Sequence, residues 1–284
     1  MTPGTGPRCV EQSRRADEPL AGTAPHAQRW VCVEHAGPWT PTIAADPDRG
    51  IVTFAERAAA EGWRLVLIRR PGSRGPVGRS RVYLADTSPA ESRLTTLAVD
   101  DLREIELTVA HGDPTPHPVL LVCGHGARDQ CCVLDGRPLA VAVAESGADV
   151  WECTHLGGHR FAPSAVVLPT GFAYGRLDLS GALAAYQAAD VGEMEARYCR
   201  GRTTWLSAGQ IAELAVRAET GIREAAALTV DVTGPRRVEV RHNDGAVWEV
   251  RLRRRALDGV RPPSCGAEPE QVSSLVAGTV ERLR

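Results

Sequence analysis

The sequence has 284 residues and no lysine, so its 33 permanently basic side chains are all arginines. They are offset by 35 acidic side chains, which leaves a formal net charge of −2. Proteins that bind nucleic acid over a broad surface usually carry an excess of positive charge. The nearly balanced charge therefore argues against nucleic acid as a partner.

Long hydrophobic runs are missing as well. A helix that crosses a bilayer needs about 20 predominantly apolar residues, whereas apolar stretches such as residues 119–122 are only as long as a β-strand. The first 20 residues are rich in proline, glycine, arginine and acidic residues and lack the apolar segment of a secretory signal. These features predict a cytoplasmic protein with no membrane partner, and a disordered tail over residues 1–28.

The eight cysteines are too few for a disulfide scaffold in a chain of this length. Because no secretory signal is recognisable, we expect the chain in a reducing compartment. Cysteines that cluster with histidines in such a compartment indicate metal binding or catalysis rather than disulfide bonds.

The length of the chain favours about two compact units, and the first is expected over residues 29–112. Apolar runs typical of buried strands occur at 29–34, 65–68 and 81–84. Between the first two runs, apolar residues recur at helical spacing. This alternation predicts an N-terminal α/β unit.

A second unit is expected over residues 113–200. Its predicted elements are a strand at 119–122, a helix from about 132 to 145, a strand at 149–153, a hairpin of 165–168 with 172–175, and a helix at 182–189. The order strand, helix, strand, strand, strand, helix is that of a thioredoxin-like domain. The predicted fold class is therefore α/β, with a thioredoxin-like domain preceded by a second α/β unit.

The last part of the chain, residues 201–284, predicts a small C-terminal subdomain. It begins with a helix at 208–219, and three strands follow at 228–232, 237–240 and 247–252. The segment Asn243-Asp244-Gly245 is a strong turn signal that joins the last two strands as a hairpin. A helix with a β-hairpin is therefore expected after the thioredoxin-like domain.

Two cysteines and two histidines stand out as candidate metal ligands. Cys123 and Cys132 are nine residues apart, and the segment His155-Leu156-Gly157-Gly158-His159 follows them. All four side chains are expected just after strand ends, where ligands on loops at one edge of a sheet can converge. The two glycines disfavour a regular helix between the histidines, so a loop is expected to aim both imidazoles.

The spacing of these residues distinguishes between metals. Structural zinc normally uses cysteine pairs two to four residues apart, which Cys123 and Cys132 do not match, although the histidine pair suits zinc. Iron–sulfur clusters tolerate longer loops, because two irons separate the ligand pairs in space. In such a cluster one iron is held by the cysteines and the other by the histidines.

The four residues resemble the motif of the sucrase/ferredoxin-like family, a branch of the thioredoxin-like [2Fe-2S] ferredoxins. That motif is C-x8-C followed by H-x3-H, and it matches Cys123, Cys132, His155 and His159. The resemblance extends over roughly residues 20–200. It implies a [2Fe-2S] cluster as cofactor with these four side chains as its metal ligands, whereas typical members of the wider group use four cysteines.

Neighbouring residues leave part of the ligand set open. Cys131 adjoins Cys132 and offers a C-x7-C spacing instead, while the family spacing selects Cys132. Neighbours on a helix point about 100 degrees apart, so only one of the two is expected to face the cluster. Cys153 is expected to be a buried core residue, and His125 a solvent-exposed loop residue. The remaining cysteines, expected as tail or buried thiols, are Cys9, Cys32, Cys199 and Cys265.

The ligand set predicts a function. Neutral imidazoles in place of thiolates leave a cluster less negative and raise its reduction potential: Rieske centres lie at about −150 to +300 mV, against about −400 mV for four-cysteine plant-type ferredoxins. Loss of an outer imidazole proton on oxidation then couples the electron to a proton. The leading hypothesis is a one-electron carrier with an unidentified redox partner protein, rather than a stand-alone enzyme.

Two other classes are kept as alternatives. One is a structural zinc domain in an interaction protein, which would be colourless where an iron–sulfur protein is brown. The other is a thiol-disulfide oxidoreductase that uses Cys131, Cys132 or Cys153 on a thioredoxin-like fold. The second alternative is disfavoured because the chain has no C-x-x-C and adjacent cysteines form a strained disulfide.

Overall fold

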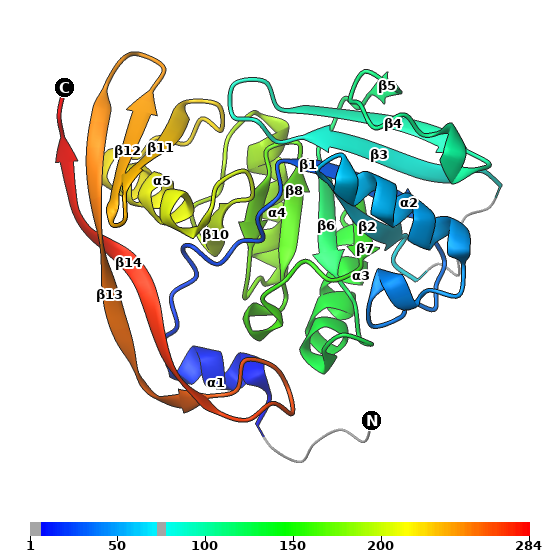
Figure 1. The fold of residues 1–284 in the computed structure, drawn as a ribbon, viewed down its shortest axis with the longest axis horizontal. Helices are drawn as coiled ribbons and strands as arrows, with labels where there is room; N and C mark the ends of the chain where they lie inside the picture. The colour runs from blue at the N-terminus through cyan, green and yellow to red at the C-terminus, as the bar shows by residue number, and fades with distance from the viewer. Residues whose placement is uncertain (1–6, 73–77) are drawn as a thin grey trace.

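The computed structural model describes residues 7–72 and 78–284. Within these ranges ten strands form one mixed sheet, in the order β10-β9-β8-β6-β7-β2-β1-β3-β4-β5 (Figure 1). Four further strands form a second sheet, in the order β11-β12-β13-β14. The predicted α/β class is confirmed at this level: a large mixed sheet, a smaller second sheet and few helices.

The strands of the large sheet are β1 (Arg29–Glu34), β2 (Trp63–Arg69), β3 (Ser80–Asp86), β4 (Arg93–Val99), β5 (Asp113–Pro114), β6 (Val119–Cys123), β7 (Val150–Cys153), β8 (Ala165–Leu168), β9 (Phe172–Tyr174) and β10 (Cys199–Arg202). The second sheet consists of β11 (Leu228–Gly234), β12 (Arg237–His242), β13 (Val247–Arg261) and β14 (Glu270–Arg282). The helices are α1 (Cys9–Arg15), α2 (Arg49–Ala60), α3 (Arg137–Glu145), α4 (Leu179–Asp190) and α5 (Ser207–Thr220), and a π-helical turn over Cys132–Gly136 leads into α3.

The large sheet is built from two halves with the same connectivity. In each half a strand, a helix and a parallel strand are followed by two antiparallel strands, first as β1-α2-β2-β3-β4 and then as β6-α3-β7-β8-β9. The halves join where β2 pairs antiparallel with β7. The segments 29–112 and 113–200, expected as two units, both contribute strands to this one sheet, and the β2–β7 pairing satisfies backbone groups that two free edge strands would leave open.

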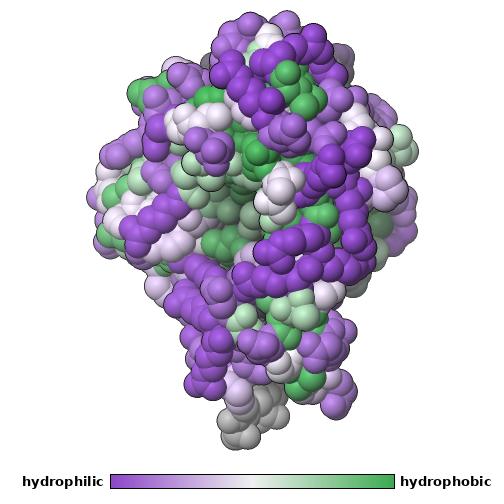
Figure 2. Space-filling view, turned by 90° about the vertical axis from the view of Figure 1, so that its left-hand side faces the viewer, coloured by the Kyte–Doolittle hydropathy of each residue, from purple (hydrophilic) through white to green (hydrophobic). Residues whose placement is uncertain are grey.

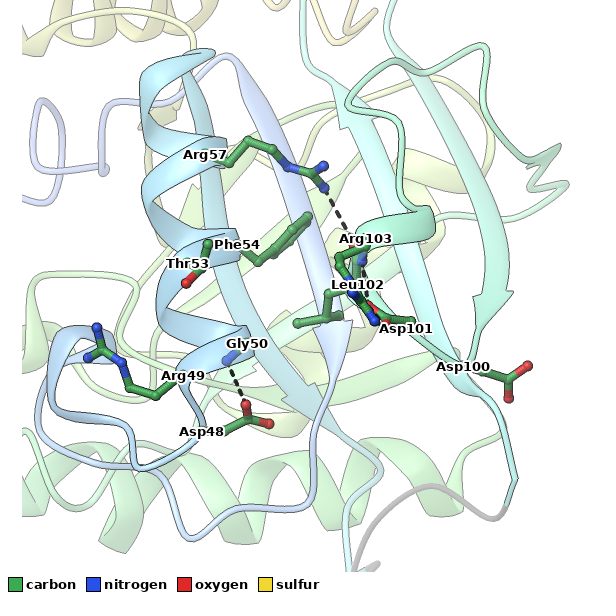
Figure 3. A pocket seen from close by; sticks show the side chains of 10 residues that line it. All are labelled: Asp48, Arg49, Gly50, Thr53, Phe54, Arg57, Asp100, Asp101, Leu102 and Arg103. Carbon is green, nitrogen blue, oxygen red and sulfur yellow. Dashed lines mark hydrogen bonds and ion pairs between the residues drawn. The ribbon is translucent and has the colours of Figure 1, made fainter.

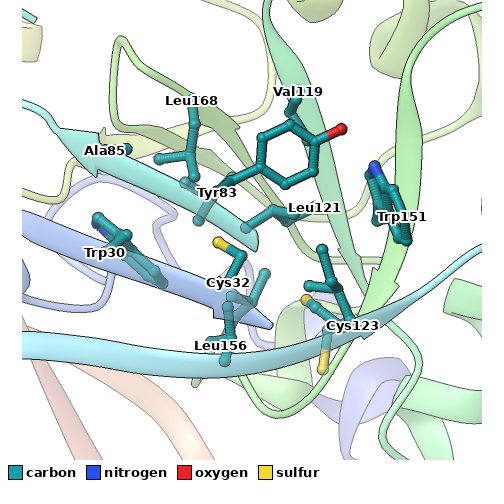
Figure 4. Packing of buried hydrophobic residues seen from close by; sticks show 14 of the residues in the cluster. Trp30, Cys32, Tyr83, Ala85, Val119, Leu121, Cys123, Trp151, Leu156 and Leu168 are labelled. Carbon is teal, nitrogen blue, oxygen red and sulfur yellow. The ribbon is translucent and has the colours of Figure 1, made fainter. Parts of the chain in front are cut away.

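One apolar cluster spans both halves on one face of the sheet (Figure 4). Alternate residues of a strand share a face, so Trp30 and Cys32 from β1 pack in the same cluster as Leu121 and Trp151 from the second half. On the opposite face, α2 packs over the first half and α3 with α4 over the second. Cys123 belongs to the shared cluster and therefore ends β6 on the face away from these helices.

Several predicted elements are confirmed. The hairpin predicted between 165 and 175 is formed by β8 and β9, the helix predicted from about 132 is the π-helical turn with α3, and the turn at 243–245 joins β12 and β13. The last strand differs from its prediction, since β13 continues to Arg261 and pairs with an unpredicted β14. Most residues of this outer ribbon are exposed or half-buried, so its sequence lacks the apolar pattern by which strands are recognised.

The prediction of a disordered tail is wrong for residues 7–28. Cys9–Arg15 form α1, in which Cys9 and Val10 are buried. The buried carboxylate of Glu18 binds the guanidinium groups of Arg160, at 2.8 Å, and of Arg261. Composition predicted disorder because apolar residues are scarce here, but those present pack against distant parts of the chain. Residues 1–6 of the expected tail lie outside the described residues.

The β13–β14 ribbon extends away from the second sheet and reaches α1 (Figure 1). The ribbon thus connects the C-terminal sheet to the N-terminal helix along the outside of the molecule.

Viewed from the side of this second sheet, the surface is largely hydrophilic at its edges and hollowed near its centre, where more hydrophobic residues gather (Figure 2). Among the described helices none has the length and apolar character to span a bilayer.

Truncation of the shared cluster should weaken the whole fold. Leu121 is fully buried in the cluster that both halves share, and we expect Leu121→Ala to lower the free energy of unfolding by about 2–5 kcal/mol through lost burial and a residual cavity. Urea unfolding followed by tryptophan fluorescence measures this change. The matched control is Leu134→Ala, because Leu134 is 55% exposed, and its effect should stay within about 0.5 kcal/mol. Equal effects of both substitutions would contradict a shared core.

Candidate metal centre

The strand end of β6 and the start of the π-helical turn bring two cysteines together. Cys123 is the last residue of β6 and Cys132 the first residue of the turn. The turn lies so close to the strand end that a Cβ at Gly136 would stand 2.1 Å from the carbonyl oxygen of Cys123, so only glycine fits there. The ligand atoms of Cys123, Cys132 and His155 all lie within 4.8 Å of one another. Three of the four predicted ligands thus form one group.

The two thiols of this group have opposite acidities. Contact with Cys132, and less strongly with His155, lowers the pKa of Cys123 well below its usual value despite burial. The pKa of Cys132 is raised, first by its contact with Cys123 and then by burial. The pair therefore favours one thiolate that accepts a hydrogen bond from one thiol. A metal bound by both sulfurs would release the remaining proton.

His155 is held in place through its backbone. Its Nδ1 lies 3.9 Å from the Sγ of Cys123. Its backbone N–H donates to Nδ1 of His125 at 3.1 Å, and its carbonyl oxygen accepts a hydrogen bond from Nη2 of Arg64 at 3.1 Å. The position of the His155 backbone therefore depends on two side chains, of His125 and Arg64, that are not among the four predicted ligands.

His159 lies beside this group without being part of it. Its ring stacks on that of His155, with 5.4 Å between ring centroids. Its Nε2 lies 2.7 Å from the carbonyl oxygen of Pro263, so this nitrogen carries the proton and donates. The other nitrogen, Nδ1, is buried and has no hydrogen-bond partner in the described part of the chain. Since burial lowers the pKa of His159, the imidazole is held neutral with a free, desolvated lone pair.

His125 is not the solvent-exposed loop residue that the sequence predicted. Its residue exposure is 4%. Since Nδ1 accepts the N–H of His155, the proton sits on Nε2, which donates to the carbonyl oxygen of Thr40 at 2.9 Å. Both ring nitrogens are therefore occupied, and His125 orients His155 instead of offering a ligand atom.

Arg200 is a residue of this centre that the sequence did not reveal. Its side chain is buried, Nη1 donates to the carbonyl oxygen of Gly157 at 3.0 Å, and Nε donates to the hydroxyl of Thr23 at 3.1 Å. Gly158 has φ +72°, and a Cβ there would stand 2.2 Å from Nη2 of Arg200. Burial lowers the pKa of Arg200 to about 9. Nothing in the sequence distinguishes this arginine from the many others.

The adjacent cysteines belong to different groups. Cys132 faces Cys123, whereas the Sγ of Cys131 lies 3.6 Å from that of Cys9 and 3.3 Å from that of Cys265. The sequence did not predict this second group, because its members come from opposite ends of the chain. Cys32, Cys153 and Cys199 are buried core thiols, as expected.

A surface pocket lies away from both groups, between α2 and the segment that follows β4 (Figure 3). Its polar side chains serve the protein's own structure: Arg57 donates to the carbonyl oxygen of Leu102 at 3.1 Å, and Asp48 accepts the N–H of Gly50 at 2.8 Å. None of the four predicted ligands lines it. The pocket is therefore separate from the candidate metal centre.

Comparison with known proteins agrees with the motif. No curated protein sequence and no solved structure matches the chain. A family model for sucrase/ferredoxin-like proteins, however, matches residues 20–183, which include both cysteines and both histidines of the motif. This match covers more than half of the sequence and confirms the resemblance that the motif indicated. The chain belongs to the sucrase/ferredoxin-like family.

Proposed function

We propose that this protein is a one-electron carrier that binds a [2Fe-2S] cluster through Cys123, Cys132, His155 and His159. The observation that carries the proposal is the buried Nδ1 of His159, which has no hydrogen-bond partner in the described residues and lies in the ring stacked on His155. Leaving a buried polar atom without a partner costs about 1–3 kcal/mol. A metal bound at this nitrogen would remove that cost.

The donor set fits an iron–sulfur cluster chemically. Two thiolates and two neutral imidazoles are known cluster ligands. Nε2 of His159 already donates a hydrogen bond to the carbonyl oxygen of Pro263, which leaves Nδ1 as the ligand atom. Hydrogen bonds from a ligand's second nitrogen to a carbonyl oxygen fix its tautomer and orientation in metal sites. The family name, which includes ferredoxin, points in the same direction.

The chain topology supports a thioredoxin-like assignment for the half that carries the ligands. Residues 119–190 run as strand, helix, strand, strand, strand, helix. In the sheet, β7, β6, β8 and β9 are neighbours in that order, with β6 and β7 parallel and the other pairs antiparallel. Cys123 ends β6, Cys132 begins the π-helical turn that leads into α3, and both histidines lie in the segment after β7.

A bound cluster would supply reversible uptake of one electron. The surrounding residues would influence its reduction potential and its exposure to a partner protein. Arg64 and Arg200, which hold the carbonyl groups of His155 and Gly157, place positive charge near the centre and favour the more negative reduced state. Cys123 and Cys132 are only 2% and 1% exposed, whereas His155 is half-buried. The histidine loop is thus the side from which a partner protein would exchange electrons.

A structural zinc site is the second candidate for the same residues. It is favoured by one observation, that the ligand atoms of Cys123, Cys132 and His155 lie within 4.8 Å of one another, a separation that suits a single ion as well as a cluster. The thiol-disulfide alternative has less support. Its candidate nucleophiles Cys131, Cys132 and Cys153 are at most 1% exposed, so a substrate disulfide has little access to them.

Metal and sulfide analysis separates the candidates. Protein purified without oxygen should contain two irons and two sulfides per chain and absorb visible light that bleaches on reduction. Adjacent substitutions provide the matched control: Cys132→Ser should lose most of the iron, whereas Cys131→Ser should keep it, because only Cys132 faces Cys123. A colourless protein with zinc at these residues would overturn the electron-transfer proposal, and iron loss in the Cys131 variant alone would reverse the ligand assignment.

Replacing a histidine ligand by cysteine should lower the reduction potential. His155→Cys or His159→Cys exchanges a neutral donor for an anionic one, and we expect a fall on the order of 100 mV or more, given the gap between Rieske and four-cysteine centres. Potentiometric titration monitored by visible absorption measures the change. The control is His117→Cys, at an exposed histidine bonded to Asp190. An unchanged potential in both ligand variants would remove the histidines from the ligand set.

The proton coupling inferred from the sequence stays a prediction. Oxidation makes a cluster more positive and promotes loss of an outer imidazole proton, so the potential should fall with rising pH, by up to about 59 mV per unit for one proton and one electron. Potentials recorded between about pH 6 and 10, a range around the ordinary histidine pKa and above it, test this. A flat profile would refute the coupling and leave the ligand assignment intact.

A further inference from the structure

We propose a second metal site, in which Cys9, Cys131 and Cys265 bind a zinc ion together with Asp129. The ligand atoms of these four residues lie within 4.8 Å of one another. The proposal is independent of the cofactor bound by Cys123 and Cys132, since the two groups share no residue.

The three sulfurs form a triangle of nearly the size that a zinc ion requires. The Sγ–Sγ distances are 3.3 Å for Cys131 and Cys265, 3.5 Å for Cys9 and Cys265, and 3.6 Å for Cys9 and Cys131. Tetrahedral zinc with Zn–S bonds of about 2.3 Å separates its sulfurs by about 3.8 Å. A disulfide needs about 2.05 Å and uses only two sulfurs, so it would leave the third thiol unpaired in the same space.

Asp129 supplies the fourth donor and organises the others. Its Oδ2 lies 4.0 Å from the Sγ of Cys9 and accepts the backbone N–H of Cys265 at 3.0 Å. Its Oδ1 accepts the backbone N–H of Cys131 at 2.8 Å. The carboxylate also lies 3.7 Å from Nε2 of His159, which is an approach and not a hydrogen bond. Carboxylate oxygen is an established zinc ligand beside thiolates.

The burial of these three thiols and one carboxylate favours a bound metal over four ligand groups without one. Cys9 and Cys131 have no exposed surface, Asp129 is 5% exposed and Cys265 is half-buried. A buried carboxylate next to three thiols is unfavourable unless a cation or metal balances it, and thiolate sulfur selects soft or borderline ions such as zinc. The donor types and their burial therefore point to zinc rather than to magnesium or calcium.

The four residues come from three segments that are far apart in the sequence. Cys9 begins α1, Asp129 and Cys131 lie in the loop after β6, and Cys265 lies in the tip that connects β13 with β14. Cys131 is 122 residues from Cys9 and 134 residues from Cys265. A bound ion would tie the N-terminal helix and the ribbon tip to the loop between Cys123 and Cys132. Cys9 and Cys265 fall outside the segment that the family model matches, whereas Asp129 and Cys131 lie inside it, so the site joins the flanking parts to the matched segment.

Zinc analysis of the full chain tests the proposal. Protein purified without oxygen from cells supplied with iron and zinc should contain one zinc per chain, and X-ray absorption at the zinc edge should report three sulfurs and one oxygen. Cys265→Ser and Cys9→Ser should each weaken zinc binding by at least tenfold in competition with a chelator, with the iron content unchanged. Cys199→Ser, at a buried thiol outside both groups, is the matched control and should keep the zinc.

Three results would overturn the site. They are absence of zinc from wild-type protein even after zinc is added, a three-sulfur zinc signal that persists in Cys265→Ser, and a disulfide among the three cysteines in anaerobically purified protein. Zinc with two sulfurs and two imidazoles would instead locate the metal at Cys123 and Cys132, which overturns the cluster proposal and leaves no zinc for the second site.

Wild-type protein alone gives a further readout, because zinc removal should speed proteolysis at residues 262–269.

Discussion

Antiparallel pairing of β2 with β7 determines how the two halves of the molecule meet. It joins the two halves of the large sheet, and at this joint the backbone N–H of Thr154 donates to the carbonyl oxygen of Leu67, while the N–H of Leu67 donates to the Thr154 hydroxyl. The ion pair between the half-buried Arg69 and the buried Glu152, at 2.7 Å, reinforces it. Because Thr154 precedes His155, the first half of the protein determines where the histidine loop begins.

The candidate metal centre is consequently assembled from both halves. The second half provides the sulfur and nitrogen donors, and the first half positions them: Arg64 from β2 holds the carbonyl oxygen of His155, and Thr40 fixes the tautomer of His125, which in turn holds the His155 backbone. Buried charge without a bound partner is costly, and here the half-buried Arg64 and the buried Arg200 both donate to loop carbonyl groups. The N-terminal half, which carries none of the predicted ligands, therefore acts as the support of the site.

The β13–β14 ribbon connects this centre to the C-terminal sheet. Its tip carries Pro263, whose carbonyl oxygen accepts a hydrogen bond from Nε2 of His159. Two residues further on, Cys265 contacts Cys9 and Cys131. The position of the tip therefore affects both groups of candidate ligands at once. A metal at the second group would hold the tip in place, and with it the hydrogen bond that orients His159.

Elements with strong local patterns and the candidate ligand motif could be predicted before the structure was known. The clustered cysteines and histidines, together with the resemblance to a family with a C-x8-C and H-x3-H motif, led to Cys123, Cys132, His155 and His159, which all lie in the segment that the family model matches. Only the tertiary structure decided which of Cys131 and Cys132 faces Cys123, that His125 and Arg200 are buried supports, and that Cys9 and Cys265 meet. These facts depend on contacts between segments from 30 to more than a hundred residues apart, or on the direction in which one helical turn points, and neither leaves a periodic pattern in the sequence.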